Sequence, residues 1–383
     1  MRLLLFDEAF LGHHAIWMEE TLRAVREIAP HVEVTYAFPY AFEDSSGHTA
    51  WREPTRHHVL RKLQSLTGRP WLAAEKWRSL QRLVKKTQAD RVLILFADEF
   101  LHPRYVPHVS FEWVPIYFHP RFLRGDPMQP PLAALSAPSC PFVYVLDEGI
   151  RQALSELTGK PVIKIPDFCP TECGPATPRC HALRLAADGR PIIGAIGPLT
   201  RHKNVGTLIE VAKRHSEWHF LLAGLVFPNA LSDGERKRVE EAQQMENVTC
   251  FYEYLPHEEL NTLTAMCAIQ FAAYRRFLHS SNKMVRACVY RTPLVVAAAG
   301  CMGEMVTQYR LGETCDPANV ASIEAAIARS LMIEQKAADW DGYLAANSLE
   351  SLRRSLTPLV TEDGSAAAKT LASESLTAKD KPR

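Results

Sequence analysis

The sequence contains no long hydrophobic run. Its apolar stretches, such as residues 293–299, fall far short of the ~20 residues that span a bilayer, so we expect no transmembrane helix. The amino-terminal segment MRLLLFD reaches an acidic residue too early for the apolar region of a signal peptide, and no small-residue cleavage site follows it. These two absences predict a protein that stays in the cytoplasm.

An excess of charge of one sign is also missing. The chain has 44 Lys and Arg against 43 Asp and Glu, which gives a formal net charge of +1. We therefore expect no field over the whole protein that attracts nucleic acid, and the sequence has no nucleic-acid recognition motif. Any basic partner site must be local.

Cysteine spacings typical of a disulfide framework or a zinc site are absent. The nine cysteines are an odd set scattered through apolar segments, as reduced thiols are. Cys169, Cys173, Cys180 and His181 lie near one another in the sequence, but the cysteines are separated by three and six intervening residues and form no Cys-x-x-Cys pair. We expect no metal site there, with zinc as the alternative. The first strand of neither half is followed by Gly-x-Gly-x-x-Gly, which disfavours a dinucleotide oxidoreductase.

The sequence does contain a regular alternation of short apolar runs and amphipathic stretches of helical length. In 383 residues that are 47% hydrophobic, this pattern predicts an α/β fold with parallel sheets in two domains of ~150–200 residues. In the first half we expect strands at 2–6, 32–37, 91–97, 114–118, 142–146 and 162–165, and helices at 14–28 and 71–87. In the second half we expect strands at 192–196, 219–223, 248–252, 268–272 and 294–297, and helices at 204–214, 233–244 and 258–266.

The alternation breaks at residues 166–190, which hold four prolines, two glycines and three cysteines. We assign residues 1–168 to an amino-terminal domain, 169–190 to a linker, 191–335 to a second domain, 336–360 to a helix that could cross back onto the first domain, and 361–383 to a disordered tail. Two doubly wound domains place the carboxyl ends of their sheets, where ligands bind, on facing sides of a central cleft.

One segment is locally basic. Residues 51–91 carry eleven Lys or Arg and three Asp or Glu, an excess of 11 − 3 = +8, with Trp51, Trp71 and Trp77 among them. Basic amphipathic helices with tryptophan can lie on anionic membranes, which would suit an acceptor on a lipid carrier. We favour a solvated basic face beside the acceptor cleft, with peripheral membrane contact through residues 51–91 as the alternative.

Four motifs follow one another in the second half. They are PIIGAIGPLTRHKN at 191–204, VTCFYEYLPHEEL at 248–260, SSNKMVRACVYRTPLVV at 280–296 and AGCMGEMV at 299–306. In this order they resemble the donor-binding domain of GT-B glycosyltransferases, in particular the large retaining group called family four. The resemblance covers roughly residues 191–331 and implies a GT-B fold of two Rossmann-like domains.

The first motif supplies the cations that the family uses. Lys203 matches the family lysine, whereas Pro198 stands at the family arginine, so a guanidinium could come only from Arg201. The resemblance implies that these cations stabilise the leaving nucleoside diphosphate. The family's paired glutamates are replaced by Leu278 and Arg286. Arg286 could bind a nucleobase or phosphate, or mark a donor site that has decayed.

The last two motifs supply the other donor residues that the resemblance implies. Asn282 and Lys283 could hold donor phosphate or sugar hydroxyls at a helix N-terminus. Gly300 lets the backbone approach an anion closely, and the amides of Cys301 and Met302 could bind diphosphate or sugar oxygens. Glu304 is expected to contact the donor as well.

In the first domain the resemblance rests on histidines. Gly12, His13 and His14 follow the first strand, where the family has its acceptor loop. His119 ends the strand at 114–118, where the family histidine contacts the donor sugar near the reacting carbon. The resemblance makes His119 the catalytic candidate, with a purely structural strand-end histidine as the alternative. It implies no metal and no cofactor beside the nucleotide-sugar donor.

These residues predict a retaining hexosyltransferase that moves a sugar from a nucleotide-sugar donor to a glycan, lipid-linked or small-molecule acceptor in polysaccharide or glycoconjugate biosynthesis. Domain closure would exclude water, because hydrolysis of the donor competes with transfer. The alternatives are a non-catalytic GT-B scaffold or binding subunit, and a sugar-nucleotide epimerase or phosphorylase of the same architecture. The sequence leaves open the sugar, the nucleotide, the acceptor, the linkage and the oligomeric state.

Overall fold

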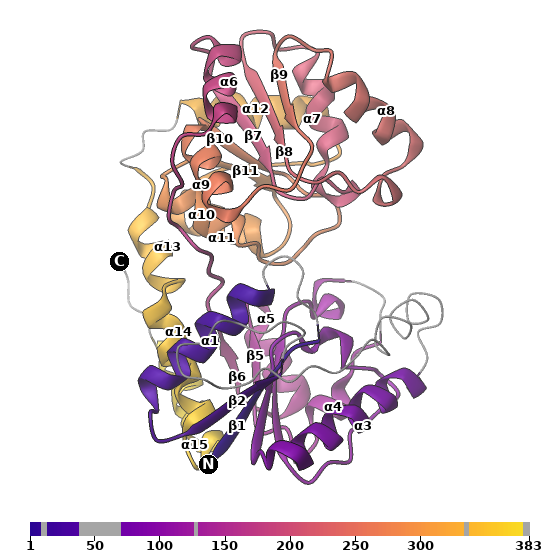
Figure 1. Cartoon of the computed structure of the whole chain (residues 1–383), viewed down its shortest axis with the longest axis vertical. Helices are drawn as coiled ribbons and strands as arrows, with labels where there is room; N and C mark the ends of the chain where they lie inside the picture. Colours follow the sequence, from indigo (N-terminus) through magenta and orange to yellow (C-terminus); the bar gives the residue numbers. More distant parts are fainter. Residues whose placement is uncertain (9–13, 38–69, 126–128, 333–336, 378–383) are drawn as a thin grey trace. The chain divides into compact units, whose positions relative to one another are not determined.

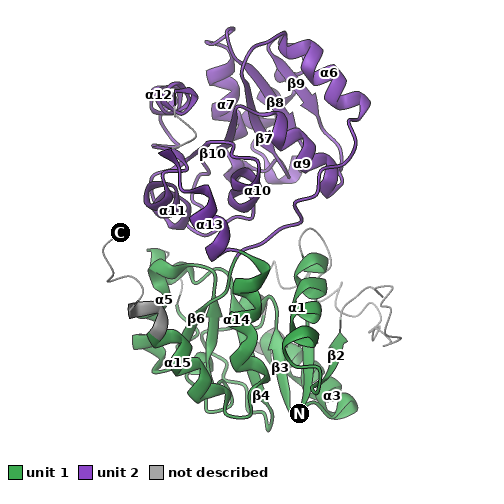
Figure 2. Cartoon of the chain, turned by 90° about the vertical axis from the view of Figure 1, so that its left-hand side faces the viewer, with its two compact units in different colours: residues 1–166, 348–383 green, residues 167–347 purple. Residues whose placement is uncertain are grey.

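The computed structural model describes residues 1–8, 14–37, 70–125, 129–332 and 337–377. The chain forms two compact units, residues 1–166 with 348–383 (unit 1) and residues 167–347 (unit 2), coloured separately in Figure 2. Each unit holds one six-stranded parallel sheet with helices on both faces (Figure 1). The predicted class, α/β with two doubly wound Rossmann-like sheets, is confirmed.

The sheet of unit 1 is built from segments at the start of the chain. Its strands are β1 (Arg2–Phe6), β2 (Glu33–Ala37), β3 (Arg91–Ile94), β4 (Glu112–Tyr117), β5 (Val143–Val145) and β6 (Val162–Lys164). Its helices are α1 (His14–Ile28), α3 (Pro70–Thr87), α4 (Leu132–Leu135), α5 (Glu148–Thr158), α14 (Leu349–Val360) and α15 (Gly364–Thr377), with short 3-10 turns η1 (Ala97–Glu99) and η2 (Arg121–Arg124). The strand order is β2-β1-β3-β4-β5-β6, so it reverses between β1 and β3. A ligand site is expected at that switch point.

Unit 2 repeats the architecture. Its strands are β7 (Ile192–Ile196), β8 (His219–Ala223), β9 (Val248–Phe251), β10 (Ile269–Ala272), β11 (Leu294–Ala297) and β12 (Gly312–Cys315). Its helices are α6 (Pro178–Ala187), α7 (Val205–Ala212), α8 (Asp233–Ala242), α9 (His257–Met266), α10 (Lys283–Val289), α11 (Cys301–Tyr309), α12 (Val320–Leu331) and α13 (Trp340–Ala346), with 3-10 turns η3 (Arg201–Lys203) and η4 (Pro228–Ala230). The order β12-β11-β10-β7-β8-β9 puts the switch point between β7 and β10.

Burial explains why the apolar runs become strands. All residues of β7, β8 and β11 are buried, as expected for parallel strands covered on both faces. Helices α7, α8 and α12 share one hydrophobic cluster on the sheet of unit 2, and α6 and α9 share another. Helix starts carry side-chain caps: Ser232 and Glu235 form a capping box at α8, and Asn319 accepts the Ser322 amide at α12.

The structure differs from three sequence predictions. The expected linker at 169–190 contains helix α6, whose Thr177 caps its start and whose Leu183 is fully buried in unit 2. The single helix expected over 336–360 is two helices, because Ser348 starts α14 anew with a cap on the Ser351 amide. The expected disordered tail contains α15, whose Ala368 is fully buried. Strand β12, with its half-polar sequence GETC, was not predicted.

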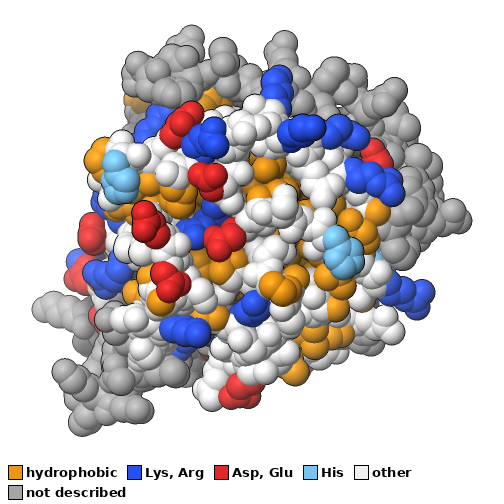
Figure 3. Space-filling view, turned by 90° about the horizontal axis from the view of Figure 1, so that it is seen from below, with side chains coloured by type: hydrophobic (Ala, Val, Ile, Leu, Met, Phe, Trp, Pro, Cys, Tyr) orange, Lys and Arg blue, Asp and Glu red, His pale blue; other side chains and the backbone are white. Residues whose placement is uncertain are grey.

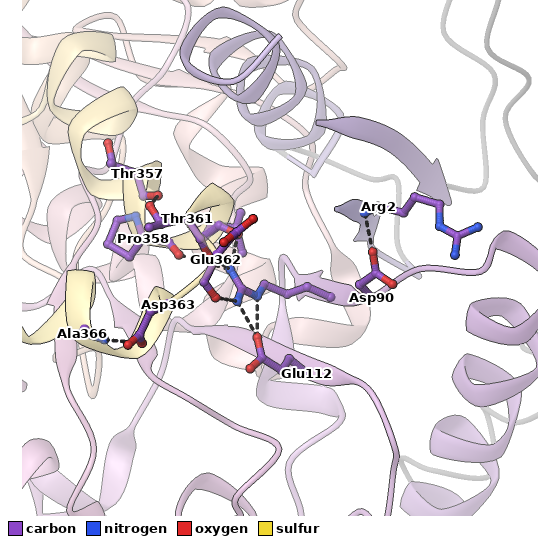
Figure 4. Close-up of polar contacts among 11 residues, drawn as sticks. Arg2, Asp90, Glu112, Thr357, Pro358, Thr361, Glu362, Asp363 and Ala366 are labelled. Atoms are coloured by element: carbon purple, nitrogen blue, oxygen red, sulfur yellow. Dashed lines mark hydrogen bonds and ion pairs between the residues drawn. The ribbon is translucent and has the colours of Figure 1, made fainter. Parts of the chain in front are cut away.

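The returning carboxyl-terminal segment is held in unit 1 by Arg91, which is 4% exposed. Its guanidinium donates to the carbonyls of Pro358, Leu359 and Thr361 at 3.3, 2.7 and 2.9 Å, where α14 ends (Figure 4). Its Nε donates to the Glu112 carboxylate at 2.7 Å. A helix ends with carbonyls that have no partner inside the helix, and Arg91 supplies donors to them. Arg91 therefore links the start of β3 to the end of α14.

A buried histidine makes the stability of unit 2 sensitive to acid. His219 in β8 is fully buried, its Nε2 lies 2.8 Å from the Thr249 hydroxyl, and its Nδ1 has no hydrogen-bond partner among the described residues. Burial lowers its pKa to about 4, with the charge of Arg190 adding to the effect. The unfolded chain then binds the proton more readily than the folded one between about pH 6.5 and 4. Stability is complete above that range and falls as the pH is lowered through it.

We predict that acidification from pH 7 to 4 costs unit 2 up to about 3 kcal/mol through His219 alone. In urea unfolding followed across this range, His219→Asn should show a shallower pH dependence than the wild type. His181→Asn, which removes an exposed histidine of α6, is the matched control and should behave like the wild type. Identical pH profiles for His219→Asn and the wild type would refute the assignment.

Candidate functional site

The switch point of unit 2 is shaped by the turn between β7 and α7. η3 ends at Lys203, and Asn204 adopts a left-handed conformation with φ 59° before the helix begins at Val205. The Asn204 side-chain amide donates to the carbonyls of Ala273 and Pro317 at 3.1 and 2.7 Å. Asn204 thereby fixes this turn to the carboxyl end of β10. Lys203 lies in the turn before the helix, which begins one residue later than the start at 204 expected from the sequence.

Lys203 and Lys283 meet at one tyrosine, Tyr274, which follows β10. The Lys203 ammonium lies 3.8 Å from the centre of the Tyr274 ring, and the Lys283 ammonium lies 5.5 Å from it. Phe277 adds a second ring at 5.6 Å from the Lys203 nitrogen. Two cations that approach aromatic faces at the carboxyl edge of a sheet form a positively charged site. Three separate segments of the sequence contribute to it.

The lysines differ in exposure. Lys203 is partly exposed, whereas Lys283, the first residue of α10, is 7% exposed and donates to the Phe271 carbonyl at 3.3 Å. Burial lowers the pKa of Lys283, and Tyr274 raises it again. Lys203 is therefore the cation that a ligand can contact. Lys283 is buried and contributes its positive charge to the site without being exposed to a ligand. Asn282, which the sequence paired with Lys283, is partly buried and precedes α10.

The glycine turn before α11 closes around a neighbouring loop. Gly300 has φ 87°, and a Cβ there would lie 2.7 Å from Cα of Leu278. The Cys301 amide donates to the Leu278 carbonyl at 3.1 Å, so it is already used. Cys301 and Met302 are buried, and Glu304 is exposed in the first turn of α11. Gly300 thus fixes the loop that precedes α10 against the start of α11.

Two arginines of the motifs are engaged elsewhere. Arg286 is 5% exposed and donates from Nε to the Asn261 side chain at 2.6 Å, with His257 Nδ1 at 3.4 Å from its Nη2. Asn261 in turn donates to the carbonyls of Pro170 and Glu172. Arg286 therefore helps to hold the segment after β6 and is occupied within the fold. Arg201 is exposed, 3.9 Å from the Glu235 carboxylate.

In unit 1, His119 follows β4 and contacts an aspartate. Its Nδ1 lies 3.2 Å from Asp98 Oδ1, and the same carboxylate accepts the backbone amides of Phe118 and His119 at 2.9 and 2.7 Å. The His119 side chain remains 37% exposed. Asp98 therefore orients a histidine whose other ring nitrogen can face a ligand. The sequence identified His119, but not Asp98.

A second histidine–aspartate pair lies at the switch point of unit 1. His14, the first residue of α1, lies 2.7 Å from the carboxylate of Asp7, which is 3% exposed and follows β1. The His14 ring packs on Phe96 at 3.7 Å between centroids, and Phe96 stacks on Phe118 at 4.2 Å. The two pairs thus lie at one edge of the sheet, joined by aromatic rings. Gly12 and His13 lie outside the described residues.

The predicted basic segment is only partly described. Residues 51–69 lie outside the described part, and Trp77 of α3 is 1% exposed with its indole nitrogen donating to the Phe100 carbonyl at 3.1 Å. Trp77 is a core residue and therefore cannot take part in the membrane contact that the sequence left as the alternative for residues 51–91. On the face in Figure 3, Lys and Arg are interspersed with Asp, Glu and hydrophobic side chains. Among the described helices none is long and apolar enough to cross a bilayer.

The cysteine cluster does not form a ligand set. Cys169 and Cys180 are buried in different hydrophobic clusters, and Cys173 is exposed. Across the described ranges no group of three or more His, Cys, Asp or Glu side chains could hold a metal ion. The zinc alternative for this segment therefore has no structural support.

Sequence comparison places one family on unit 2. Residues 181–344 match the family described as "Glycosyl transferases group 1", which is less than half of the chain. No curated protein matches the sequence. The family resemblance predicted for the second half is confirmed over these residues.

Solved structures similar to this chain cover both units. The sucrose-phosphate synthase of Thermosynechococcus elongatus is 15% identical, with a TM-score of 0.61 over 99% of this chain and 100% of its own. An α,α-trehalose-phosphate synthase (UDP-forming) of Burkholderia vietnamiensis is 10% identical, with a TM-score of 0.68 over 94% and 99%. An E. coli structure described as trehalose-6-phosphate bound with UDP-2-fluoro glucose is 12% identical, with a TM-score of 0.61 over 98% of each chain. At these identities the similarity establishes the fold.

Proposed function

We propose that the chain, which has a GT-B fold and whose residues 181–344 match the group 1 glycosyl transferases, transfers a hexosyl group from a nucleotide-sugar donor to an acceptor hydroxyl in the cytoplasm. The observation that carries the proposal is the pair of lysines beside Tyr274 at the switch point of unit 2. A nucleoside diphosphate gains negative charge as it leaves the sugar, and a fixed cation at that point lowers the barrier. Lys203, which is partly exposed, would contact the departing diphosphate.

The reaction breaks the bond between the anomeric carbon and the diphosphate oxygen and forms a bond to the acceptor oxygen. The acceptor proton would pass to the departing phosphate oxygen, on the same face of the sugar, which retains the anomeric configuration. Charge on the diphosphate would be met by Lys203 and by backbone amides near Gly300, without a metal ion.

His119 and the aromatic edge of unit 1 would serve the acceptor side. His119 presents a partly exposed ring that Asp98 orients, so it can hydrogen-bond a sugar hydroxyl near the reacting carbon. His14, held by Asp7 and Phe96, would bind the acceptor beside it. The acceptor is a glycan, a lipid-linked sugar or a small molecule. Peripheral membrane contact through residues 51–91, in which Arg78 and Arg82 of α3 are exposed cations, would suit the lipid-linked class.

A donor screen tests the proposal. The full chain is incubated with UDP-, GDP-, ADP- and dTDP-sugars and an acceptor extract, and release of nucleoside diphosphate is measured. UDP sugars come first because the E. coli structure holds UDP-2-fluoro glucose. Saturable release that requires the acceptor supports a transferase. Absence of both release and saturable nucleotide binding across the panel would indicate a scaffold and overturn the proposal.

We predict that His119→Ala lowers kcat by about 10²-fold and that Asp98→Asn lowers it by about tenfold, with little change in donor KM. The smaller effect of Asp98→Asn follows because one charge-assisted hydrogen bond is worth ~1.5 kcal/mol. Glu156→Gln, which removes an exposed carboxylate of α5, is the matched control and should keep full activity. If Asp98→Asn matches the control, Asp98 has no part in orienting His119.

A further inference from the structure

The hydroxyl of Tyr274 is enclosed in the positively charged site. Tyr274 is 2% exposed, and its hydroxyl oxygen has no hydrogen-bond partner of regular geometry within the described part of the chain. A buried hydroxyl without a partner costs about 1–3 kcal/mol, so its presence requires a reason. The ammonium nitrogens of Lys203 and Lys283 lie 3.8 and 5.5 Å from the centre of its ring.

The two lysines have no acidic counterpart. In the described residues neither Lys203 nor Lys283 forms an ion pair with a carboxylate, although Lys283 is only 7% exposed. A buried ammonium without a negative partner is costly, because the charged form loses its hydration. The group nearest to both lysines that can become negative is the Tyr274 phenol. The cluster therefore needs either a phenolate or a bound anion.

The charged side chains around Tyr274 are cationic and favour its phenolate form. Lys203 and His202 face it from η3, Lys283 faces it from α10, and Arg286 lies behind Lys283. Burial alone would raise the pKa of Tyr274, but the positive charges of Lys203 and Lys283 outweigh burial and lower it to about 8. Phenolate is thus accessible near neutral pH at this position, in contrast to the buried Tyr144 and Tyr343, where burial raises the pKa.

We propose that Tyr274 is a proton-linked positioning residue of the diphosphate site. Its phenolate neutralises Lys203 and Lys283 while the site is empty, and it takes up one proton from solvent when a nucleoside diphosphate binds to Lys203. When the diphosphate leaves, the phenol returns that proton. This inference rests on the proposed function, since it assumes that the anion is the donor diphosphate.

The direction in which nucleotide affinity changes with pH follows from the linkage between binding and protonation of Tyr274. A bound diphosphate adds negative charge beside the phenol and favours its protonated form, so binding is strongest when Tyr274 is already neutral. Affinity should therefore be constant below the pKa of about 8 and fall above it, by about tenfold between pH 7 and 9. The ligand adds no titration of its own in this range, because a terminal phosphate ionises with a pKa of about 6.

Absorbance tests the phenolate without any ligand. The tyrosinate band of the full chain is recorded from pH 6 to 11 for the wild type and Tyr274→Phe. The wild type should lose one phenol near pH 8, and Tyr274→Phe should not. Tyr254→Phe, which removes an exposed tyrosine, should retain that step. Lys283→Met should move the step to higher pH, since one of the two positive charges is gone. Absence of a step near pH 8 in the wild type would overturn the proposal.

Calorimetry tests whether nucleotide binding is coupled to protonation of Tyr274. Calorimetric titrations with UDP, GDP, ADP and dTDP at pH 7, 8 and 9 should show the tenfold loss for the wild type and less than twofold for Tyr274→Phe. Tyr274→Phe removes only the hydroxyl, and thermal unfolding verifies that the variant is folded. The test compares its own affinities at pH 7 and pH 9, so a changed affinity at pH 7 does not affect the outcome. Parallel losses in both proteins would overturn the proposal. If no diphosphate binds to either protein, the proposed function fails, whatever the absorbance step shows.

Discussion

Lys203→Ala is expected to lower kcat/KM for nucleoside-diphosphate release by about 10²–10³-fold, the loss typical when one preorganised charge-stabilising group is removed. Lys203 is the partly exposed cation of the site, 3.8 Å from the Tyr274 ring, and the turn that carries it is fixed by Asn204. Most of the loss should fall on kcat, because the charge on the diphosphate is larger as the bond breaks than in the bound donor.

A matched lysine separates this effect from a general loss of charge. Lys213→Ala also removes one positive charge from unit 2, but Lys213 is a surface residue paired with Glu210 and Glu241 at 3.2 Å. It should keep wild-type activity, since exposed ion pairs contribute little. Thermal unfolding would verify that both variants are folded. Equal activity of Lys203→Ala and Lys213→Ala would show that the diphosphate does not bind at Lys203.

Arg91→Met should reduce the free energy of unfolding of unit 1 by about 3–4 kcal/mol. The substitution leaves the carbonyls at the end of α14 without their donors and the Glu112 carboxylate without its partner. The expected phenotype is release of α14 and α15 from the sheet, followed by cooperative loss of unit 1. Urea unfolding followed by tryptophan fluorescence measures it, because Trp17, Trp77 and Trp113 are all buried in unit 1.

Arg353→Met provides the control on the same returning segment. Arg353 lies in α14 and pairs with Glu27 of α1 at 2.5 Å, but its side chain is 31% exposed. A surface pair of this kind is worth about 0–1 kcal/mol, so the control should unfold close to the wild type. If the two methionine variants are equally stable, the buried contacts of Arg91 do not hold the end of the chain.

The sheets could be predicted closely where strands are short and apolar. The bounds of β1, β7, β8 and β11 agree with those expected from the sequence. β12 escaped prediction because its residues Gly312–Cys315 are half polar, and pairing with β11 makes them a strand. α15 was not predicted because Ala, Ser and Thr give no amphipathic pattern. Its packing within unit 1 through the buried Ala368 stabilises it as a helix.

The candidate site could be predicted only in the parts that the motifs carry. Lys203 and Lys283 belong to separate motifs, and the fold brings both to Tyr274, which is in neither. A tyrosine after a strand has the same sequence signal as a core residue, so its charge environment is invisible before the strands are ordered. Asp98 was missed for the same reason, because its contact with His119 joins the ends of two strands.

The route of the chain has a consequence for synthesis at the ribosome. Unit 1 includes residues 348–383, so its buried α14 arrives only after all of unit 2 has been translated. Domains usually fold in the order of their synthesis, yet here the inserted unit is complete first, and the earlier strands wait for their last helices. A truncated chain that ends at Asn347 and has left the ribosome should hold a protease-resistant second half and a protease-sensitive first half.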